Sequence, residues 1–471
     1  EYMNEKASGP RESGEPTDPV KGATSIARVL LAAGGARLFV LPLTGLCAVA
    51  TARVITKAVG IEQFGVVMLV ATLSQFLAFA DLGAGAAVAT ARAQADEIDS
   101  GVASFRGILL TAVRTTLASG ALLASAAVLL GVLGAWPRLL GIQHAHLASS
   151  MNLSAVLALS AFAAALPFAV GEAVLRGAGR VHEAVLLLGI SPPTALLLAI
   201  AFRQIGVPAF AYALVLPAGA WVAAMACAVR AWWLDREAFG NLLRNVLRPF
   251  SVRGLPIAAT AVPMFIVMIG LPIALQSDRI IIAHRLDEVS LSNYSYASQL
   301  YLPLWSVVSV AALALWPHFA AGVHNQAALR KGWLTGIAML GGAGTAIAVG
   351  FLLLARYVIG WMSNGEATPS WSLLVAFALL LIVQSIHVTT GILLIEPGKL
   401  RFQAKCVIAL VLTNLPLSWA LTPSLGAAGP VFASAITVLL CQLLPGIAVA
   451  AAATRPTDDE NTRGPRDQVD A

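Results

Sequence analysis

Residues 230–254, RAWWLDREAFGNLLRNVLRPFSVRG, form a long charged link in the middle of a chain that is otherwise mostly apolar. Of the 471 residues, 58% are hydrophobic and only 11% are charged, whereas a soluble domain carries about 25% charged residues. The mean hydropathy of +0.81 is typical of an integral membrane protein. The composition therefore predicts one polytopic bundle rather than the roughly three soluble domains that the length alone would suggest.

Apolar runs long enough to cross a membrane lie on both sides of this link. A membrane helix needs about 20 mostly apolar residues, and twelve runs meet that requirement, six before the link and six after it. They cover residues 36–56, 63–83, 108–135, 153–175, 183–204, 207–230, 256–283, 292–318, 333–355, 371–395, 402–422 and 427–452. We therefore expect an all-α polytopic membrane protein with about 12 transmembrane helices.

The Lys and Arg residues between the runs predict the orientation. Fourteen of them follow even-numbered runs and seven follow odd-numbered runs, and an excess of Lys and Arg marks the cytoplasmic side. Both termini and the link (231–255) are thus expected to be cytoplasmic. Residues 1–24 form a polar N-terminus, and residues 453–471 have the charged, Pro-containing composition of a disordered tail.

Two pairs of stretches repeat in the same order in the two halves. They are AVLRGAGR (173–180) with LLIEPGK (393–399), and VGIEQFGVVML (59–69) with VSLSNYSYASQL (289–300). In the first pair, a Gly and a cation share the same turn, at Gly179-Arg180 and Gly398-Lys399. Such repeats indicate a duplication, with six-helix lobes at 25–230 and 256–452 around a central cavity.

Motifs that mark an enzyme do not occur in the sequence. There is no Walker-type phosphate loop, HExxH or GxSxG motif, and the four cysteines lack metal-ligand spacing. The basic residues are scattered between the apolar runs and do not form the continuous face that binds nucleic acid. We expect a protein that is not an enzyme and has no metal, no nucleic-acid partner, and no cofactor beyond a coupling proton or sodium ion.

Polar residues inside the apolar runs are the candidates for function. A charge at mid-bilayer costs about 2.5–3.5 kcal/mol, so it usually faces a cavity or a partner. The candidate substrate-binding residues are Arg37, Arg53, Arg114, Gln276, Asp278, Arg279, Asn293 and Gln299. The candidates for a coupling ion are Asp81, Asp278 and His387.

Each of these residues also has a structural interpretation. Arg37 and Arg53 lie near helix ends, where a long side chain reaches the interface. Asp278 and Arg279 would neutralise each other, and His387 would be a core histidine. The sign of the set argues for function, because the deep cations come with few carboxylates. A cavity lined by Arg attracts an anion and grips phosphate through two donors.

Two longer stretches carry a resemblance to a known family. They are VGIEQFGVVMLVATLSQFLAFADLGAGAAVATARA (59–93) and ALQSDRIIIAHRLDEVSLSNYSYASQLYLPL (274–304). Both resemble polysaccharide flippases of the O-antigen type, and the GAGR and PGKL turns fit as well. The resemblance extends from about residue 25 to 452. The family belongs to a superfamily that also contains multidrug extrusion proteins and lipid II flippases.

The resemblance implies a function and a site. Members of the family move a polyprenyl-diphosphate-linked oligosaccharide from the cytoplasmic to the outer leaflet of the bacterial cytoplasmic membrane, by alternating access around a cationic cavity. The seventh-helix Asp-Arg pair of the family corresponds to Asp278-Arg279, and its first-helix cation to Arg37. A glycan polymerase or glycosyltransferase would be a partner, in addition to the lipid bilayer.

Three alternatives stay open at this point. They are a multidrug-type small-molecule antiporter, a lipid II-type flippase, and a membrane scaffold for a glycan polymerase. Lipid II flippases usually add two helices, for which this chain has no run left. Multidrug relatives often have a carboxylate in the first helix, and residues 36–56 contain none. Both departures favour the polysaccharide branch.

The orientation is tested by cysteine labelling. A single cysteine in place of Asn241, in an otherwise cysteine-free chain, should resist an impermeant thiol reagent added to intact cells, because the link is expected to be cytoplasmic. A cysteine in place of Gln143, in an expected outer loop, should react. Equal labelling at the two positions would overturn the orientation.

Overall fold

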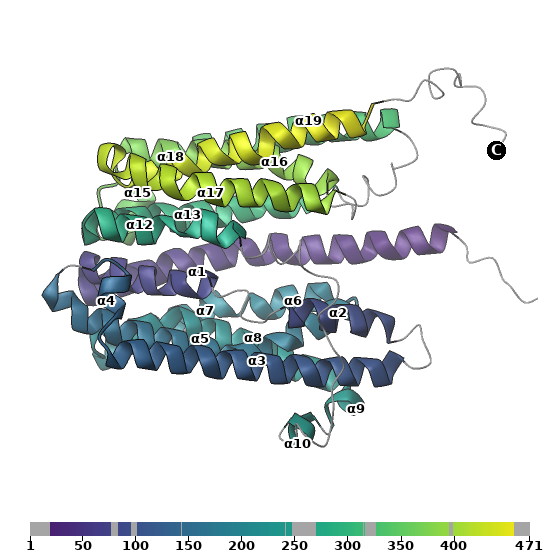
Figure 1. Cartoon of the computed structure of the whole chain (residues 1–471), viewed down its shortest axis with the longest axis horizontal. Coiled ribbons are helices and arrows are strands. Elements are labelled where there is room, and N and C mark those ends of the chain that lie inside the picture. Colours follow the sequence, from purple (N-terminus) through teal and green to yellow (C-terminus); the bar gives the residue numbers. More distant parts are fainter. Residues whose placement is uncertain are drawn as a thin grey trace, which may run out of the picture.

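Helices make up all the regular structure that is described in the computed structural model of this protein (Figure 1). The described residues are 19–76, 83–95, 101–142, 144–240, 242–246, 270–313, 315, 326–394 and 399–455. Within them, nine helical stretches are long and apolar enough to cross a membrane. The chain is therefore a multi-pass membrane protein, as its composition predicts.

The helices before the link form one group. They are α1 (Pro19–Phe76), α2 (Ala84–Gln94), α3 (Gly101–Val132), α4 (Trp136–Leu139), α5 (Ala145–Gly177), α6 (Val181–Leu188), α7 (Ser191–Ile205), the 3-10 helix η2 (Ala209–Leu214) and α8 (Val215–Leu234). Two short helices, α9 (Arg236–Phe239) and α10 (Leu242–Val246), belong to the link.

The helices after the link form a second group. They are a helical turn at 270–276, α12 (Asp278–Arg285), α13 (Glu288–Leu313), α15 (Gln326–Met362), α16 (Trp371–Leu393), α17 (Leu400–Leu425), α18 (Ala428–Thr437), the π-helix η4 (Val438–Leu443) and α19 (Leu444–Ala453). The two groups form the two lobes of Figure 1, and α1 is the helix of the first lobe that faces the second lobe.

The first predicted run and the described part of the second, up to Phe76, lie in α1, which is kinked inside its range. Gly60 has φ 80° and ψ 170°, a backbone conformation that is accessible mainly to glycine, and it separates one membrane helix from the next. The seventh predicted run is described only from residue 270. α1 begins at Pro19, inside the polar segment predicted for 1–24.

The two ends of the bundle differ in what they contain. α1 begins and α19 ends at the right of Figure 1, whereas α4 lies at the left. This arrangement agrees with an even number of crossings. We call the two ends the terminal end and the α4 end.

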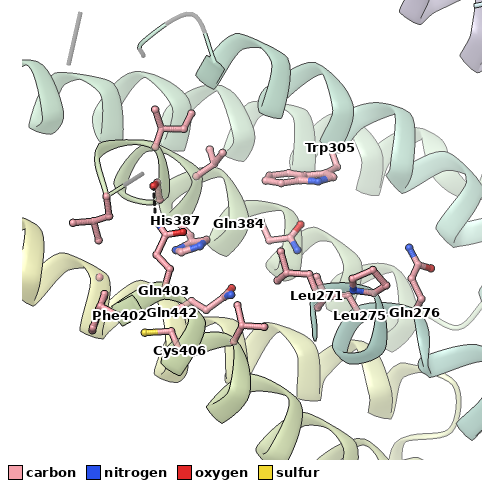
Figure 2. A pocket seen from close by; sticks show the side chains of 17 residues that line it. Leu271, Leu275, Gln276, Trp305, Gln384, His387, Phe402, Gln403, Cys406 and Gln442 are labelled. Atoms are coloured by element: carbon pink, nitrogen blue, oxygen red, sulfur yellow. Dashed lines mark hydrogen bonds between the residues drawn. The ribbon is translucent and has the colours of Figure 1, made fainter. Parts of the chain in front are cut away.

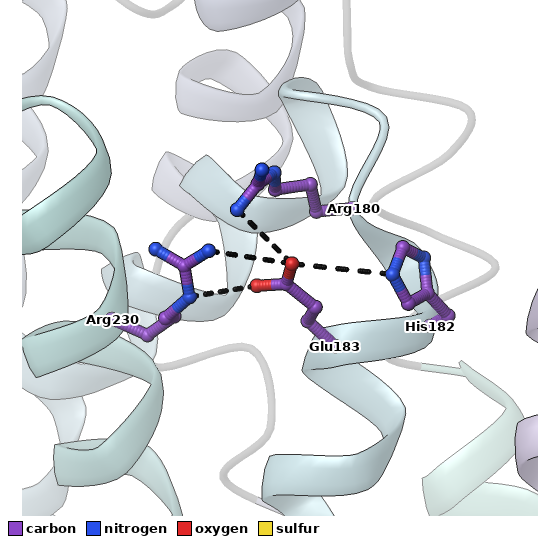
Figure 3. A network of polar contacts seen from close by, with 4 residues as sticks. All are labelled: Arg180, His182, Glu183 and Arg230. Carbon is purple, nitrogen blue, oxygen red and sulfur yellow. Dashed lines mark hydrogen bonds and ion pairs between the residues drawn. The ribbon is translucent and has the colours of Figure 1, made fainter.

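Ion pairs hold the N-terminal lobe together near the terminal end (Figure 3). The Glu183 carboxylate on α6 forms an ion pair with Arg230 on α8, with 2.8 Å between Oε2 and Nε, and its Oε1 accepts a hydrogen bond from Arg230 Nη2 at 3.3 Å. The same carboxylate is 3.0 Å from Arg180 Nη1, in the turn before α6. Arg92 on α2 similarly pairs with Asp235 at the end of α8, at 2.8 Å. Several of the loop cations that predict the orientation therefore also fix the helices of this lobe.

Candidate functional site

The two lobes meet where the second half of α1 packs against the start of α13. The Phe64 and Tyr296 rings are stacked with 4.3 Å between their centroids, and Tyr296 is also hydrogen-bonded to Thr56. Ser292 donates to the Ile61 carbonyl at 2.5 Å. These residues belong to the stretches 59–69 and 289–300, which are similar in sequence, or lie next to them.

Gly65 allows this close approach. A Cβ atom at position 65 would lie 2.5 Å from Ser292 Oγ and 3.0 Å from the Glu288 carbonyl oxygen. Real Cβ contacts are essentially never that short, so any larger residue would push α1 and α13 apart. The glycine is therefore part of the contact between the lobes.

Arg279 is buried in the same contact and bridges the lobes. Only 4% of its surface is exposed. Its Nη1 donates to Thr72 Oγ1 of α1 at 2.9 Å, and its Nη2 donates to Ser298 Oγ of α13 at 3.1 Å. The guanidinium also lies over the Tyr294 ring, 5.5 Å from its centroid. One cation thus holds a hydroxyl from each lobe.

Asp278 is buried beside Arg279 without forming an ion pair with it in the described structure. Its exposure is 2%, and its Oδ2 accepts a hydrogen bond from Tyr294 at 3.1 Å. Asp278 Oδ1 and Arg279 Nε have no hydrogen-bond partner. Buried polar atoms without partners are rare in folded proteins, so this pair has hydrogen-bonding capacity that the described protein does not use.

Two further contacts join the lobes near the α4 end. His144, which precedes α5, lies 2.7 Å from Glu288 at the start of α13, measured from Nδ1 to Oε2. Arg53 of α1 donates to the Trp361 carbonyl at the end of α15, and its guanidinium lies 4.3 Å from the Trp361 ring centroid. Together with the α1–α13 contact, they form what we call the seal.

The remaining sequence-predicted residues are spread over the molecule. Arg114 donates to the backbone carbonyls of Asn245 and Val246 in the link. Gln299 donates to Met68 Sδ at 3.2 Å. The side chain of Arg37 and the whole of Asp81 lie outside the described structure. Asn293, on α13, has a buried Oδ1 without a hydrogen-bond partner.

A cavity of about 470 Å³ lies inside the C-terminal lobe (Figure 2). It is enclosed by the 270–276 helical turn, α13, α16, α17, η4 and α19. Its polar lining residues are Gln276, Gln384, His387, Gln403 and Gln442, and Trp305 and Phe402 are among its aromatic ones. We call it the glutamine cavity.

Local sequence explains how some of these side chains reach the cavity. Gln384 and His387 are three residues apart on α16, so they share one helix face. Gln442 lies in the π-helix η4. Pro445 follows, and because it has no N–H it cannot donate to the Cys441 carbonyl one turn earlier. A π turn therefore stands just before this proline, at the residue that lines the cavity, and such turns are frequent at functional sites.

Some of the sequence-predicted residues lie in the seal and others in the glutamine cavity. Asp278 and Arg279 belong to the seal, whereas Gln276 and His387 line the glutamine cavity. Gln403, Gln442 and Trp305 are not among the residues predicted from the sequence. The sequence does show that Gln442 is a glutamine within an apolar run. It does not show where the side chain points, because Gln442 lies in a π turn.

A second cavity, of about 810 Å³, lies in the N-terminal lobe between α3, α5 and α8. Its lining is almost entirely apolar and includes Gly120, Pro167 and Trp232. It offers few groups for specific recognition of a polar ligand.

Comparison with solved structures identifies the class of fold. An inward-facing multidrug resistance MATE family transporter of the MOP superfamily matches with a TM-score of 0.66 and 16% identity, over 92% of this chain and 100% of that chain. The lipid II flippase MurJ, in an inward closed conformation, matches with a TM-score of 0.61 and 16% identity, over 88% and 86%. An outward-facing MATE transporter of the same superfamily gives 0.50 and 16%, over 93% and 97%.

The chain thus has the two-lobed fold of MOP superfamily transporters. No family model and no curated protein sequence matched it. At 16% identity, the structural matches define the fold and leave the substrate to be argued from this chain's own residues.

The His144–Glu288 contact predicts a pH-dependent seal. The hydrogen bond to Glu288, and then the Glu288 charge, raise the pKa of His144 above its ordinary value of 6.5, and Glu62 and Asp287 add to the effect. The ion pair is fully present below pH 6.5 and is lost as the pH rises through the raised pKa. In a cysteine-free background, spin labels at Leu139 and Val289 should show longer distances at pH 9 than at pH 6.

Two histidine variants provide the control for this measurement. His144→Gln should remove the pH dependence of the distance. His182→Gln, at the other end of the lobe, should leave it unchanged. A pH response that persists in His144→Gln would contradict the role of this contact.

Proposed function

We propose that this protein is a flippase that moves a polyprenyl-diphosphate-linked oligosaccharide across the cytoplasmic membrane by alternating access. The observation that carries the proposal is the position of the seal, which joins the lobes near the α4 end. The described hydrogen bonds between the lobes join residues 53–72 and His144 to residues 279–299 and Trp361. A pair of lobes closed near one end is what a carrier needs when the other end is to admit substrate.

The structural comparison supports an inward-facing state. The TM-score is 0.66 with the inward-facing MATE transporter and 0.50 with the outward-facing one. With cytoplasmic termini, as the Lys and Arg distribution predicts, the seal closes the outer side. The two lobes would correspond to 25–230 and 256–452, and the membrane to the bacterial inner membrane.

The charges favour an anionic lipid-linked substrate over a cationic drug. Carrying a diphosphate through about 30 Å of hydrocarbon requires a polar path. A cation-binding cavity would need carboxylates, and the described lining of the glutamine cavity has none. Arg37, Arg114 and Arg279 would supply the cations along the path, with Arg37 and Arg114 nearer the cytoplasm.

Arg279 would act by exchanging partners. In the sealed state, its guanidinium is held by Thr72 of one lobe and Ser298 of the other. When the lobes separate on the outer side, the bond to Thr72 breaks and Nη1 becomes free to bind a phosphate oxygen. Asp278, Asp81 and His387 remain the proposed groups for a coupling proton or sodium ion, and the unpartnered Oδ1 of Asp278 supports the first of them.

Translocation in reconstituted vesicles tests the proposal. Wild-type protein should move a fluorescent polyprenyl-diphosphate oligosaccharide between leaflets and should not accumulate a cationic dye. A cysteine pair at Gly45 of α1 and Pro303 of α13, placed in a chain without native cysteines, should form a disulfide between the lobes next to the seal, because a Cβ atom at position 45 would lie 3.6 Å from Pro303 Cβ, within the range of disulfides. Oxidation should stop translocation and reduction should restore it.

The single cysteine variants are the controls, since neither forms a crosslink under oxidation. Full translocation by the crosslinked protein would contradict alternating access at this seal. Accumulation of the dye without movement of the lipid would establish the multidrug alternative instead.

Substitutions at Arg279 test the phosphate contact. Arg279→Ala should abolish translocation while the protein remains in the membrane. Arg279→Lys should retain only part of the rate, because Lys offers a point charge where Arg offers two directed donors. Translocation rates, divided by the amount of protein in the vesicles, are the measurement. Normal transport by Arg279→Ala would leave Arg279 with a purely structural role.

A further inference from the structure

The glutamine cavity has unused hydrogen-bonding capacity. The Gln442 amide makes no hydrogen bond to the described protein, and neither does that of Gln276. Gln384 is only 7% exposed, and its Oε1 accepts from Tyr301, which leaves its NH₂ group for the cavity. Gln403 donates to the Gly391 carbonyl at 2.9 Å, which leaves its Oε1. Gln384 and Gln442 are the buried ones, and buried polar groups normally have a partner.

These groups offer both donors and acceptors. A side-chain amide provides two N–H donors and a carbonyl acceptor, and four such amides approach the cavity from separate helices. His387 adds Nδ1, which is buried without a hydrogen-bond partner. A ligand with several hydroxyl groups, each of which both donates and accepts, matches this lining.

Trp305 adds an apolar surface to the same cavity (Figure 2). The face of an aromatic ring carries partial negative charge, so it attracts the weakly positive C–H groups that one face of a sugar ring presents. Amides around the edge and an indole at the side form a surface that suits a pyranose. The cavity volume, about 470 Å³, lies within the range of about 300–1,000 Å³ that is usual for small-molecule sites.

The charge of the lining excludes other ligand classes. The described lining residues include no Asp, Glu, Lys or Arg. A metal ion or an organic cation would be bound without a counter-charge, and a diphosphate would be bound without a cation. An uncharged ligand with many hydroxyl groups incurs neither cost.

We propose that the glutamine cavity binds a sugar unit of the glycan, while the diphosphate binds outside it. This inference rests on the proposed function and adds a subsite to it. The C-terminal lobe then recognises the sugar through Gln384 and Gln442, and the π turn before Pro445 is the backbone feature that presents Gln442 to the ligand. Recognition of sugar and of phosphate is thereby divided between two places.

Equilibrium binding in lipid nanodiscs tests the subsite. The probes are polyprenyl diphosphates that carry glucose, galactose or N-acetylglucosamine, and the same lipid without a sugar. Wild-type protein should bind at least one sugar-bearing lipid about tenfold more tightly than the sugar-free lipid. A buried hydrogen bond contributes about 1 kcal/mol, and about 1.4 kcal/mol corresponds to tenfold in affinity.

Substitutions should remove that preference selectively. Gln384→Leu/Gln442→Leu should bind the sugar-bearing lipid no more tightly than the sugar-free lipid, with the affinity for the latter unchanged. Gln442→Leu alone, which removes no described hydrogen bond of the protein, should lose about half of the preference in free energy. Gln204→Leu, at an exposed site at the end of α7, should behave as wild type.

The outcomes separate this inference from the proposed function. Failure of the wild type to bind any of the four lipids contradicts the proposed function, and with it the subsite. Equal binding of all four lipids contradicts the subsite alone. Equal weakening of all four lipids by Gln442→Leu also contradicts the subsite, because it would place Gln442 in the fold or at the diphosphate.

Discussion

The buried guanidinium of Arg279 is the constraint to which the rest of the lobe contact is fitted. A cation within a membrane bundle is costly unless its donors are satisfied by the protein. Thr72 and Ser298 satisfy two of them, and these residues come from opposite lobes. For both hydroxyls to be in reach, α1 must approach α13 closely, which in turn requires glycine at position 65. The stacked Phe64 and Tyr296 rings then fill the contact.

Much of the fold follows from the sequence because hydropathy is a strong signal over 20 residues. The runs predict the membrane helices, and the charged link predicts the division into lobes, since both depend on the bilayer and not on detailed packing. The kink at Gly60 inside α1 likewise depends on a local feature, a glycine whose backbone conformation other residues rarely adopt. Short helices such as α2 were not predicted, because an 11-residue helix lacks a signal of that strength.

The candidate site could be predicted only in part, because a sequence shows which groups are polar and not which partners they find. Asp278 and Arg279 are predicted from the sequence to bind substrate, and the structure gives their hydrogen-bond partners as Tyr294, Thr72 and Ser298. From the sequence, Arg114 is predicted to bind substrate. In the structure, its guanidinium donates to backbone carbonyls of the link. Gln442 reaches its cavity through a π turn, a backbone detail that no periodic pattern reveals.

The chemistry of the seal suits a contact that opens and closes. Each of its hydrogen bonds contributes on the order of 1 kcal/mol net, and the one stacked aromatic pair adds about 0.5–1.5 kcal/mol. Shifting a two-state equilibrium from 1:99 to 99:1 takes about 5.5 kcal/mol of differential binding. A seal made of a few hydroxyl, amide and guanidinium contacts is of this size. A substrate that engages Arg279 in place of Thr72 would bind only the state in which the seal is open, so its contact with Arg279 is the differential interaction that would change which side of the protein is open.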